Sequence, residues 1–518
     1  MNEYDIENAI NGISEEHILA SAPKKRPART WKVLASAAAA AAVIMGAVWA
    51  IGAIKGGERP HTEAQATQPA VQEGTELPEK TEQASPAPTL FLPTEDPNAT
   101  PLPAKELTET GEKLQASALS MAMLPRLPEE GTAEYGAYIA ELRRTKYGRG
   151  AQLGGFYART INEFLGGSEE NSAYSPFSVY TALAMLAETT AGNTRQQILD
   201  LLDVPDIETL RLMTAGLVDS NYRDGEKEKI LSAASFWMND LFPVSAYHGE
   251  TLDNLVKYYR ASSFIGTMGS PEYDALMQAW INENTNDLLK DQVGNITSDP
   301  STLLRLITTL YFKAGWSNGK QLTQEMVFHG ANGDTSVDFL DGQGLDYYEG
   351  EGYTMASKGL VGGNKMWFIL PDEGVSIDSL LESGEALEVI FTGNRGAGFE
   401  GDYKVHLQAP LFDSESKLNL IDGLMRLGVT DCFDPYASDF SPLTDLDQIF
   451  VGKADHGVRI IMDEEGVEAA AYTLIEVACG AAPIQKRIIE FTADRPFIYL
   501  IMSDDNTPLF AGTLYNAD

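Results

Sequence analysis

Histidine and cysteine, two residue types that often carry out catalysis, are scarce in this chain. Its 518 residues include six histidines and two cysteines, and no two histidines have the spacing of metal ligands. The chain also lacks a Gly-x-Ser-x-Gly nucleophile motif and a glycine-rich phosphate loop. Cys479 could be a thiol nucleophile with His456 as its base, but nothing in the small-residue stretch 477–482 would fix that geometry. We therefore expect no enzyme, no cofactor and no metal site.

A more promising segment has the pattern of a loop that can become a strand. Residues 467–474 alternate between small or β-branched side chains and a set that includes a charge and a large ring, and acidic residues and a glycine precede them. One face of an extended strand could therefore enter a packed interior while the other stays outside. Three consecutive alanines are poor strand formers, so the segment could be exposed in one state and belong to a sheet in another. The alternative is an alanine-rich helix with an acidic start. The small positions are Val467, Ala469, Ala471 and Thr473.

This segment resembles the hinge of the serpins, protease inhibitors that trap their target by inserting a cut loop into a sheet. The match is an acidic residue, a glycine, a small residue, Glu-Ala-Ala-Ala and a threonine. No charge or proline occupies the small positions, which favours an inhibitory member over a non-inhibitory serpin that acts as a surface binding or structural module. The hinge residues by this match are Glu464, Gly466, Val467, Glu468, Ala469, Ala470, Ala471 and Thr473.

The resemblance implies a suicide substrate for a serine endopeptidase. The protease would cut the loop and form an acyl ester, and the hinge would insert before that ester is hydrolysed. The family's spacing puts the reactive bond at Gly480–Ala481, with Ala478, Cys479 and Ala482 as alternatives. These small side chains suit an elastase-like or subtilisin-like protease, and papain-like cysteine proteases remain an alternative. A trypsin-like enzyme would need Lys486 or Arg487, which lie too far downstream.

Further stretches match the family in order and spacing, so that the resemblance spans about residues 115–516. It implies an α+β serpin fold with three β-sheets, about nine helices and an exposed reactive-centre loop. The run 306–316 is continuously apolar, as expected for a central strand buried on both faces. Trp316, at its end, matches the family's tryptophan at the top of the large sheet. The other matching stretches are 171–178, 366–374, 409–412, 437–441, 491–497 and 509–512.

The resemblance also implies a polar cluster beneath the middle of the large sheet. Its members here are Ser175, Ser178, Thr308 and His456, with Thr308 where the family usually has asparagine. An unsatisfied buried polar group costs about 1–3 kcal/mol, so the cluster must be hydrogen-bonded both before and after insertion. We interpret it as a latch. The alternative is an ordinary core histidine whose hydrogen bonds are satisfied.

The first 112 residues differ in composition from the rest. Residues 33–54 carry no charge and, at about 33 Å as a helix, match a bilayer core of about 30 Å. The lysines and arginines before this run predict a cytoplasmic N-terminus. We therefore expect a cytoplasmic tail (1–32), a transmembrane signal anchor (33–54), a disordered Pro/Thr/Glu-rich linker (55–112) and an extracellular serpin domain (113–518) of bacterial type. The alternatives are a cleaved signal peptide, which would give a secreted protein, and a buried alanine helix.

The net charge and the cysteine content limit the binding partners and the disulfide bonds that this chain can have. The formal net charge of −37 argues against nucleic-acid binding, which requires a basic surface. Cys432 and Cys479 alone cannot form a disulfide framework. We expect a monomer that touches the membrane through residues 33–54 and forms a covalent complex with its target protease.

Overall fold

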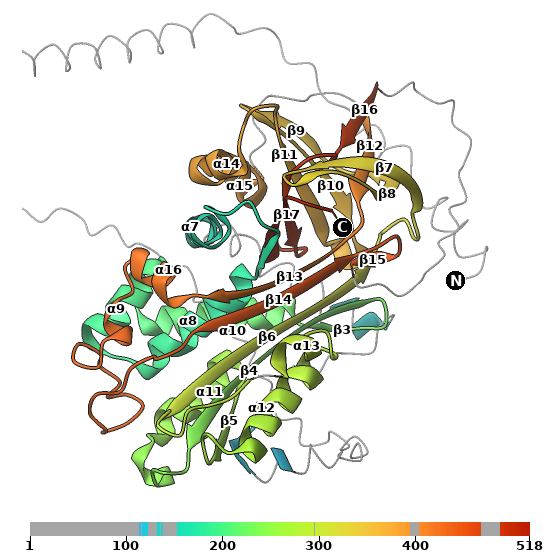
Figure 1. Ribbon diagram of the computed structural model, residues 1–518. Coiled ribbons are helices and arrows are strands. Elements are labelled where there is room, and N and C mark those ends of the chain that lie inside the picture. Colours follow the sequence, from blue (N-terminus) through green and yellow to red (C-terminus); the bar gives the residue numbers. More distant parts are fainter. Residues whose placement is uncertain are drawn as a thin grey trace, which may run out of the picture. The chain divides into compact units, whose positions relative to one another are not determined.

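The computed structural model describes short stretches between residues 113 and 137, and residues 153–517 except 295, 394–402 and 468–486 (Figure 1). The predicted tail, membrane anchor and linker lie outside the described residues, and so do residues 468–486 of the predicted loop. No helix in the described part is both long and apolar enough to cross a membrane.

The largest sheet has eight strands and contains the first residues of the hinge. Its order is β1-β5-β4-β6-β15-β14-β13, with β3 paired to β4. β4 and β5 are parallel, and the other pairs are antiparallel. The bounds are β1 (Ala118–Ser120), β3 (Arg223–Asp224), β4 (Glu228–Asn239), β5 (Ala261–Gly266), β6 (Leu304–Gly315), β13 (Phe412–Asn419), β14 (Asp455–Met462) and β15 (Gly466–Val467).

Two smaller sheets complete the β structure. The second has the order β2-β18-β17-β11-β10-β9, and the third has the order β16-β12-β8-β7. The strands of the second are β2 (Ser172–Tyr174), β9 (Tyr347–Gly350), β10 (Tyr353–Gly359), β11 (Lys365–Pro371), β17 (Phe497–Met502) and β18 (Pro508–Leu514). Those of the third are β7 (Leu322–Gly330), β8 (Gly333–Gly344), β12 (Tyr403–Pro410) and β16 (Arg487–Thr492).

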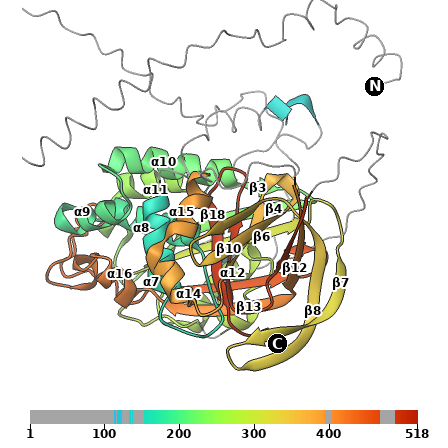
Figure 2. The same ribbon diagram turned by 90° about the horizontal axis from the view of Figure 1, so that it is seen from above.

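Ten α-helices lie in the described residues, close to the nine expected, and together with the three sheets they confirm the predicted α+β fold. α8 and α11 pack on one side of the large sheet and α12 and α13 on the other (Figures 1 and 2). The helices are α7 (Gly154–Leu165), α8 (Pro176–Thr189), α9 (Gly192–Leu201), α10 (Ile207–Asn221), α11 (Gly249–Tyr259), α12 (Pro271–Asn284), α13 (Lys290–Val293), α14 (Ile377–Ser383), α15 (Glu385–Thr392) and α16 (Ile421–Arg426).

Ser175 followed by Pro176 predicts a helix start, and α8 begins there. The Ser175 hydroxyl accepts a hydrogen bond from the Ser178 amide at 3.2 Å, and Pro176 occupies the first turn, where its missing N–H costs nothing. Most of the helix is buried, because it runs between the first two sheets. Its position fixes where Ser175 and Ser178 lie.

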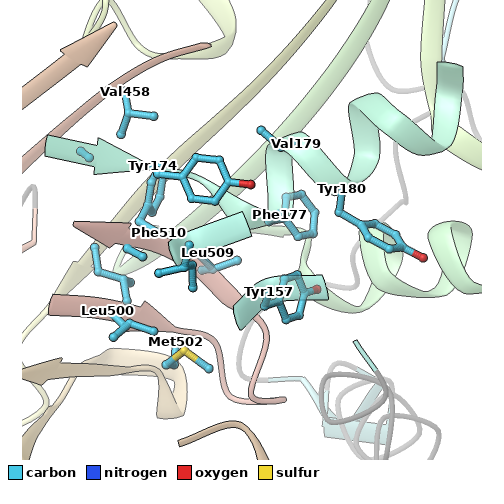
Figure 3. Close-up of a cluster of buried hydrophobic side chains, with 14 of the residues drawn as sticks. Tyr157, Tyr174, Phe177, Val179, Tyr180, Val458, Leu500, Met502, Leu509 and Phe510 are labelled. Carbon is cyan, nitrogen blue, oxygen red and sulfur yellow. The ribbon is translucent and has the colours of Figure 1, made fainter. Parts of the chain in front are cut away.

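A core of aromatic and aliphatic side chains holds α8 in place (Figure 3). Tyr157 of α7, Phe177 and Tyr180 of α8, and Leu509 and Phe510 of β18 are all nearly or fully buried. Each such side chain contributes roughly 1.5–3 kcal/mol by leaving water. The first turn of α8 is therefore pinned beneath the large sheet by packing.

Candidate functional site: the hinge and the polar cluster beneath the large sheet

The first residues of the hinge lie inside the large sheet. β15 is antiparallel to both of its neighbours, pairing Gly466 with Gly315 and Val467 with Ala314 on β6, and Val467 with Met462 on β14. Val467 is only 2% exposed, on the face that the alternation assigns to the interior. Among the described strands, β6 and β14 are joined only through β15.

The rest of the predicted loop lies outside the described residues. This applies to the hinge positions Glu468, Ala469, Ala470, Ala471 and Thr473. It applies equally to the reactive-bond candidates, which are Ala478, Cys479, Gly480, Ala481 and Ala482.

A tight turn joins β14 to β15. The Asp463 carboxylate accepts hydrogen bonds from the amides of Glu465 (2.8 Å) and Gly466 (3.0 Å), and the Asp463 amide donates to the Gly466 carbonyl (3.0 Å). A Cβ on Gly466 would lie 2.3 Å from the Ala314 carbonyl oxygen, so only glycine allows this approach to β6. Sequence reasoning recognised the glycine but gave Asp463 no role.

Trp316 holds this turn against the end of β6. The side chain is 2% exposed, and its indole N–H donates to the Asp463 carbonyl at 3.0 Å. The Trp316 backbone amide donates to the Glu465 carbonyl, also at 3.0 Å. The predicted sheet-top residue therefore lies directly against the start of the hinge.

A lysine outside the predicted site contacts both glutamates of the turn. The Lys320 ammonium lies 3.0 Å from a Glu464 carboxylate oxygen and 2.8 Å from one of Glu465. A backbone hydrogen bond and the Lys320 ammonium hold the pKa of Glu464 below its ordinary value. Lys320 is more than half exposed, so we expect each ion pair to add little stability.

A second lysine is fully buried behind Trp316. The Lys358 ammonium donates to the Gln321 side-chain oxygen (3.0 Å) and to the Gln343 carbonyl (3.1 Å), and it lies 5.3 Å from the centre of the Trp316 ring. Its two acceptors carry no formal charge. Burial lowers the pKa of Lys358 to about 8. The signal that sequence reasoning missed is a lysine between small residues in a strand.

The structure brings the four predicted latch residues together around one small cavity. Ser175, Ser178, Thr308 and His456 all line a space of about 20 Å³ between β6 and β14, enough for roughly one water molecule. The Ser175 amide donates to Nε2 of His456 at 2.9 Å. The Ser175 hydroxyl donates to the Leu509 carbonyl at 2.8 Å and lies 3.0 Å from the Ser178 hydroxyl.

His456 is the titratable member of this cluster, and its imidazole is uncharged. The residue is 8% exposed, and burial lowers its pKa to about 4. Because Nε2 accepts the Ser175 amide proton, the ring proton belongs on Nδ1. Protonation of Nε2 would remove this acceptor from a buried backbone N–H.

Thr308 is the weakest connection in the cluster. Its hydroxyl reaches the Ser178 carbonyl at 3.4 Å, near the limit for a hydrogen bond. The neighbouring Thr309 hydroxyl is buried without a hydrogen-bond partner. Threonine is shorter than the asparagine usual in the family, so the sheet is tied only loosely to α8 at this point.

Comparisons with known proteins agree with the fold. A family model described as serpin (serine protease inhibitor) matches residues 155–517. An uncharacterized serpin-like protein of Thermococcus kodakarensis is 28% identical over 364 residues, which cover 68% of this chain and 82% of that protein. Plasminogen activator inhibitor 1 of Neovison vison is 28% identical over 367 residues, which cover 66% and 86%.

A solved structure extends the likeness to three dimensions. The crystal structure of the thermophilic serpin tengpin in its native state matches with a TM-score of 0.62 and 23% identity, over 77% of this chain and 100% of that one. At that identity the likeness concerns the fold alone. The family match covers well over half of the sequence, and on that basis this chain belongs to the serpin family.

Proposed function

We propose that this chain is a suicide-substrate inhibitor of serine endopeptidases and is not itself an enzyme. The proposed targets are elastase-like or subtilisin-like proteases, and the proposed mechanism is insertion of the cleaved loop between β6 and β14. The observation that carries the proposal is β15, because two hinge residues already form an antiparallel ladder with both strands.

The register of β15 supports the mechanism. If the ladder continues, each step forward along the loop is one step back along β6 and along β14. Ala471 then lies between Leu310 and Val458, which are 9% and 3% exposed. A small side chain fits such a position without overpacking. Each added backbone hydrogen bond contributes roughly 1 kcal/mol, so a full strand would release several kcal/mol.

In the same register, the inserted hinge would reach the latch residues. Thr473 would arrive between Thr308 and His456, at the cavity that these residues line with Ser175 and Ser178. Its hydroxyl would supply a polar partner at a loosely bonded place. Thr473 and Thr308 are therefore consistent with one arrangement of the inserted loop, in which the two residues are neighbours on adjacent strands.

The proposal is tested by mixing the intact protein with elastase and with subtilisin. We expect a protease–inhibitor adduct that survives boiling in detergent, and no adduct with a protease whose catalytic serine is replaced by alanine. Mass spectrometry of the released fragment is expected to place the cut at Gly480–Ala481. Simple cutting of the loop with full protease activity would instead favour the non-inhibitory binding module. An adduct with papain alone would favour cysteine-protease inhibition.

We also propose that the chain is a monomeric, membrane-anchored serpin of bacterial type, with residues 33–54 as the anchor and the serpin domain outside. The length, apolar composition and basic flank of that segment support this proposal. Membrane fractionation of the full chain, with mass spectrometry of its N-terminus, tests it. Recovery of a soluble chain that begins after residue 54 would indicate a cleaved signal peptide and a secreted protein.

A further inference from the structure

Among the described strands, the one that follows the loop pairs with a neighbour along a single edge. β16 lies at the end of the third sheet and pairs in parallel with β12, from Arg487 opposite Tyr403 to Thr492 opposite Gln408. Ile489 and Phe491 point inward and are buried, whereas Glu490 lies on the exposed face. β16 is therefore the strand at which the loop ends, and we call it the C-terminal root of the loop. The side chains on its exposed face show which contacts other than backbone pairing hold it.

A histidine on the neighbouring strand connects β16 to a third strand. Nδ1 of His406, on β12, lies 2.5 Å from a Glu490 carboxylate oxygen on β16. Nε2 of the same ring lies 2.6 Å from an Asp341 carboxylate oxygen on β8. The other Asp341 oxygen accepts a hydrogen bond from the Gln408 side chain at 3.3 Å, which steadies that carboxylate.

Both ring nitrogens can donate only when the imidazole is protonated. A neutral ring would direct a lone pair at one of the two carboxylates. Hydrogen bonds to Asp341 and then to Glu490 raise the pKa of His406 above its ordinary value, against a smaller opposing effect of burial. The short distances from both ring nitrogens to carboxylate oxygens therefore agree with a protonated, positively charged His406.

Few other charges face His406. β8 contributes Asp341 and, directly opposite the histidine, the uncharged Gln343. β16 contributes Glu490, β12 itself carries Lys404 two residues away on the same face, and β7 presents the uncharged Leu322 opposite Asp341. The histidine thus lies between two carboxylates, with Lys404 as the nearest cation along its own strand.

We propose that His406, as an imidazolium ion, is a positioning residue that clasps β16 to β12 and β8 and makes the attachment of the loop's C-terminal root depend on pH. The consequence for loop presentation rests on the proposed inhibitory function, whereas the clasp itself does not. Because the pKa in the folded state is raised, the clasp is complete below the ordinary histidine pKa of about 6.5 and is lost as pH rises through the raised value.

Hydrogen exchange of the intact protein, without any protease, tests the clasp. After correction for the intrinsic rate, we expect opening of β16 (Arg487–Thr492) to increase from pH 6 to pH 8.5 by a few-fold to about tenfold, the range for partly exposed ion pairs. The amides of β17 should show no such change. In His406→Gln, which keeps hydrogen-bonding capacity but cannot be charged, β16 should open at every pH as it does in the wild type at pH 8.5.

His329→Gln provides a matched control. His329 lies on β7 of the same sheet, where a hydrogen bond to the Asp334 carboxylate raises its pKa, but β7 does not pair with β16. This variant should keep the wild-type pH profile of β16. The proposal is overturned if β16 opening in the wild type is independent of pH, if His406→Gln keeps the wild-type profile, or if His329→Gln abolishes it. None of these outcomes depends on protease inhibition, so failure of the clasp and failure of the inhibitory function are distinguishable.

Discussion

The two ends of the loop are held by different kinds of interaction. At the N-terminal end, buried Trp316 donates two hydrogen bonds to backbone carbonyls, and Gly466 lies almost against β6. At the C-terminal end, an edge strand is held partly by His406, which is more than a third exposed between two carboxylates. The first end is attached by main-chain bonds that can extend into a ladder. The second is attached by the backbone ladder between β16 and β12 and, in addition, by side-chain charges that depend on pH.

This difference fits what each end would do during inhibition. The hinge must remain in the sheet and lengthen there, so backbone pairing between β6 and β14 suits it. β16 must present the loop without entering the large sheet, so side-chain interactions on its open face are sufficient. Changes at the first end should therefore alter inhibition and stability strongly, and changes at the second should alter mainly the pH dependence.

The largest effect is expected from a charge on the inward face of the hinge. Ala471→Glu would place a carboxylate between Leu310 and Val458, where an unpaired charge costs several kcal/mol. We expect the variant to be cut by the target protease without forming an adduct, as seen on a denaturing gel. Ala470→Glu is the matched control, since the same register puts that position on the opposite face of the strand, between the positively charged Arg459 and the buried Tyr311. Equal adduct yields from the two variants would contradict the inferred register.

A substantial stabilisation is expected from removal of the buried cation behind Trp316. The pKa of Lys358 is lowered to about 8, so the unfolded chain binds more protons between pH 8 and 10.5 and wild-type stability should rise with pH there. Lys358→Met should lack that rise, a difference on the order of 3 kcal/mol over the whole range. Thermal unfolding at pH 7 to 9.5 checks it. Lys365→Met, which removes a more exposed lysine paired with Asp346, should not stabilise.

A pH dependence of the same origin, in a more acidic range, is expected at the latch. Because the pKa of His456 is lowered to about 4, its contribution is complete above pH 6.5 and is lost as pH falls towards 4. The loss amounts to roughly 3 kcal/mol over that interval. His456→Gln should be less stable at pH 7 but flatter between pH 4 and 6.5 in urea unfolding. Parallel curves for wild type and variant would mean that His456 is not a buried neutral histidine.

The smallest effect is expected at the exposed lysine of the turn. Lys320→Gln removes two ion pairs from a side chain that is 57% exposed, and such pairs contribute little to stability because solvent screens them. The thermal midpoint should fall by a few degrees at low salt and hardly at all at high salt. A large fall in the thermal midpoint at both salt concentrations would mean that Lys320, and not Trp316, contributes most to the stability of the N-terminal end.

Local signals were enough to predict much of this molecule. The cap and proline at Ser175–Pro176 indicated the start of α8, and the apolar run before Trp316 indicated a central strand. Matches of motif and spacing brought Ser175, Ser178 and His456 into one cluster. Such signals depend on neighbours along the chain, or on a family pattern whose members have fixed positions.

Contacts across strands could not be predicted in this way. His406 lies 65 and 84 residues from its two carboxylate partners, and in the sequence it was one of six histidines without a ligand pair. Lys358 is buried because Gln321 and Trp316 cover it, and that burial depends on how distant strands pair. Register between distant strands is set by the whole sheet, so these residues became visible only in the structure.

The central claim is that the intact fold is less stable than one in which the loop has become a full strand between β6 and β14. The most direct test compares the melting temperature of the intact protein with that of the same protein cut once in the loop between residues 477 and 487. We predict a rise of roughly 5 °C or more on cutting, since several kcal/mol would be gained and each kcal/mol shifts the melting temperature of a domain of this size by roughly 1 °C. An unchanged or lower melting temperature would contradict the account.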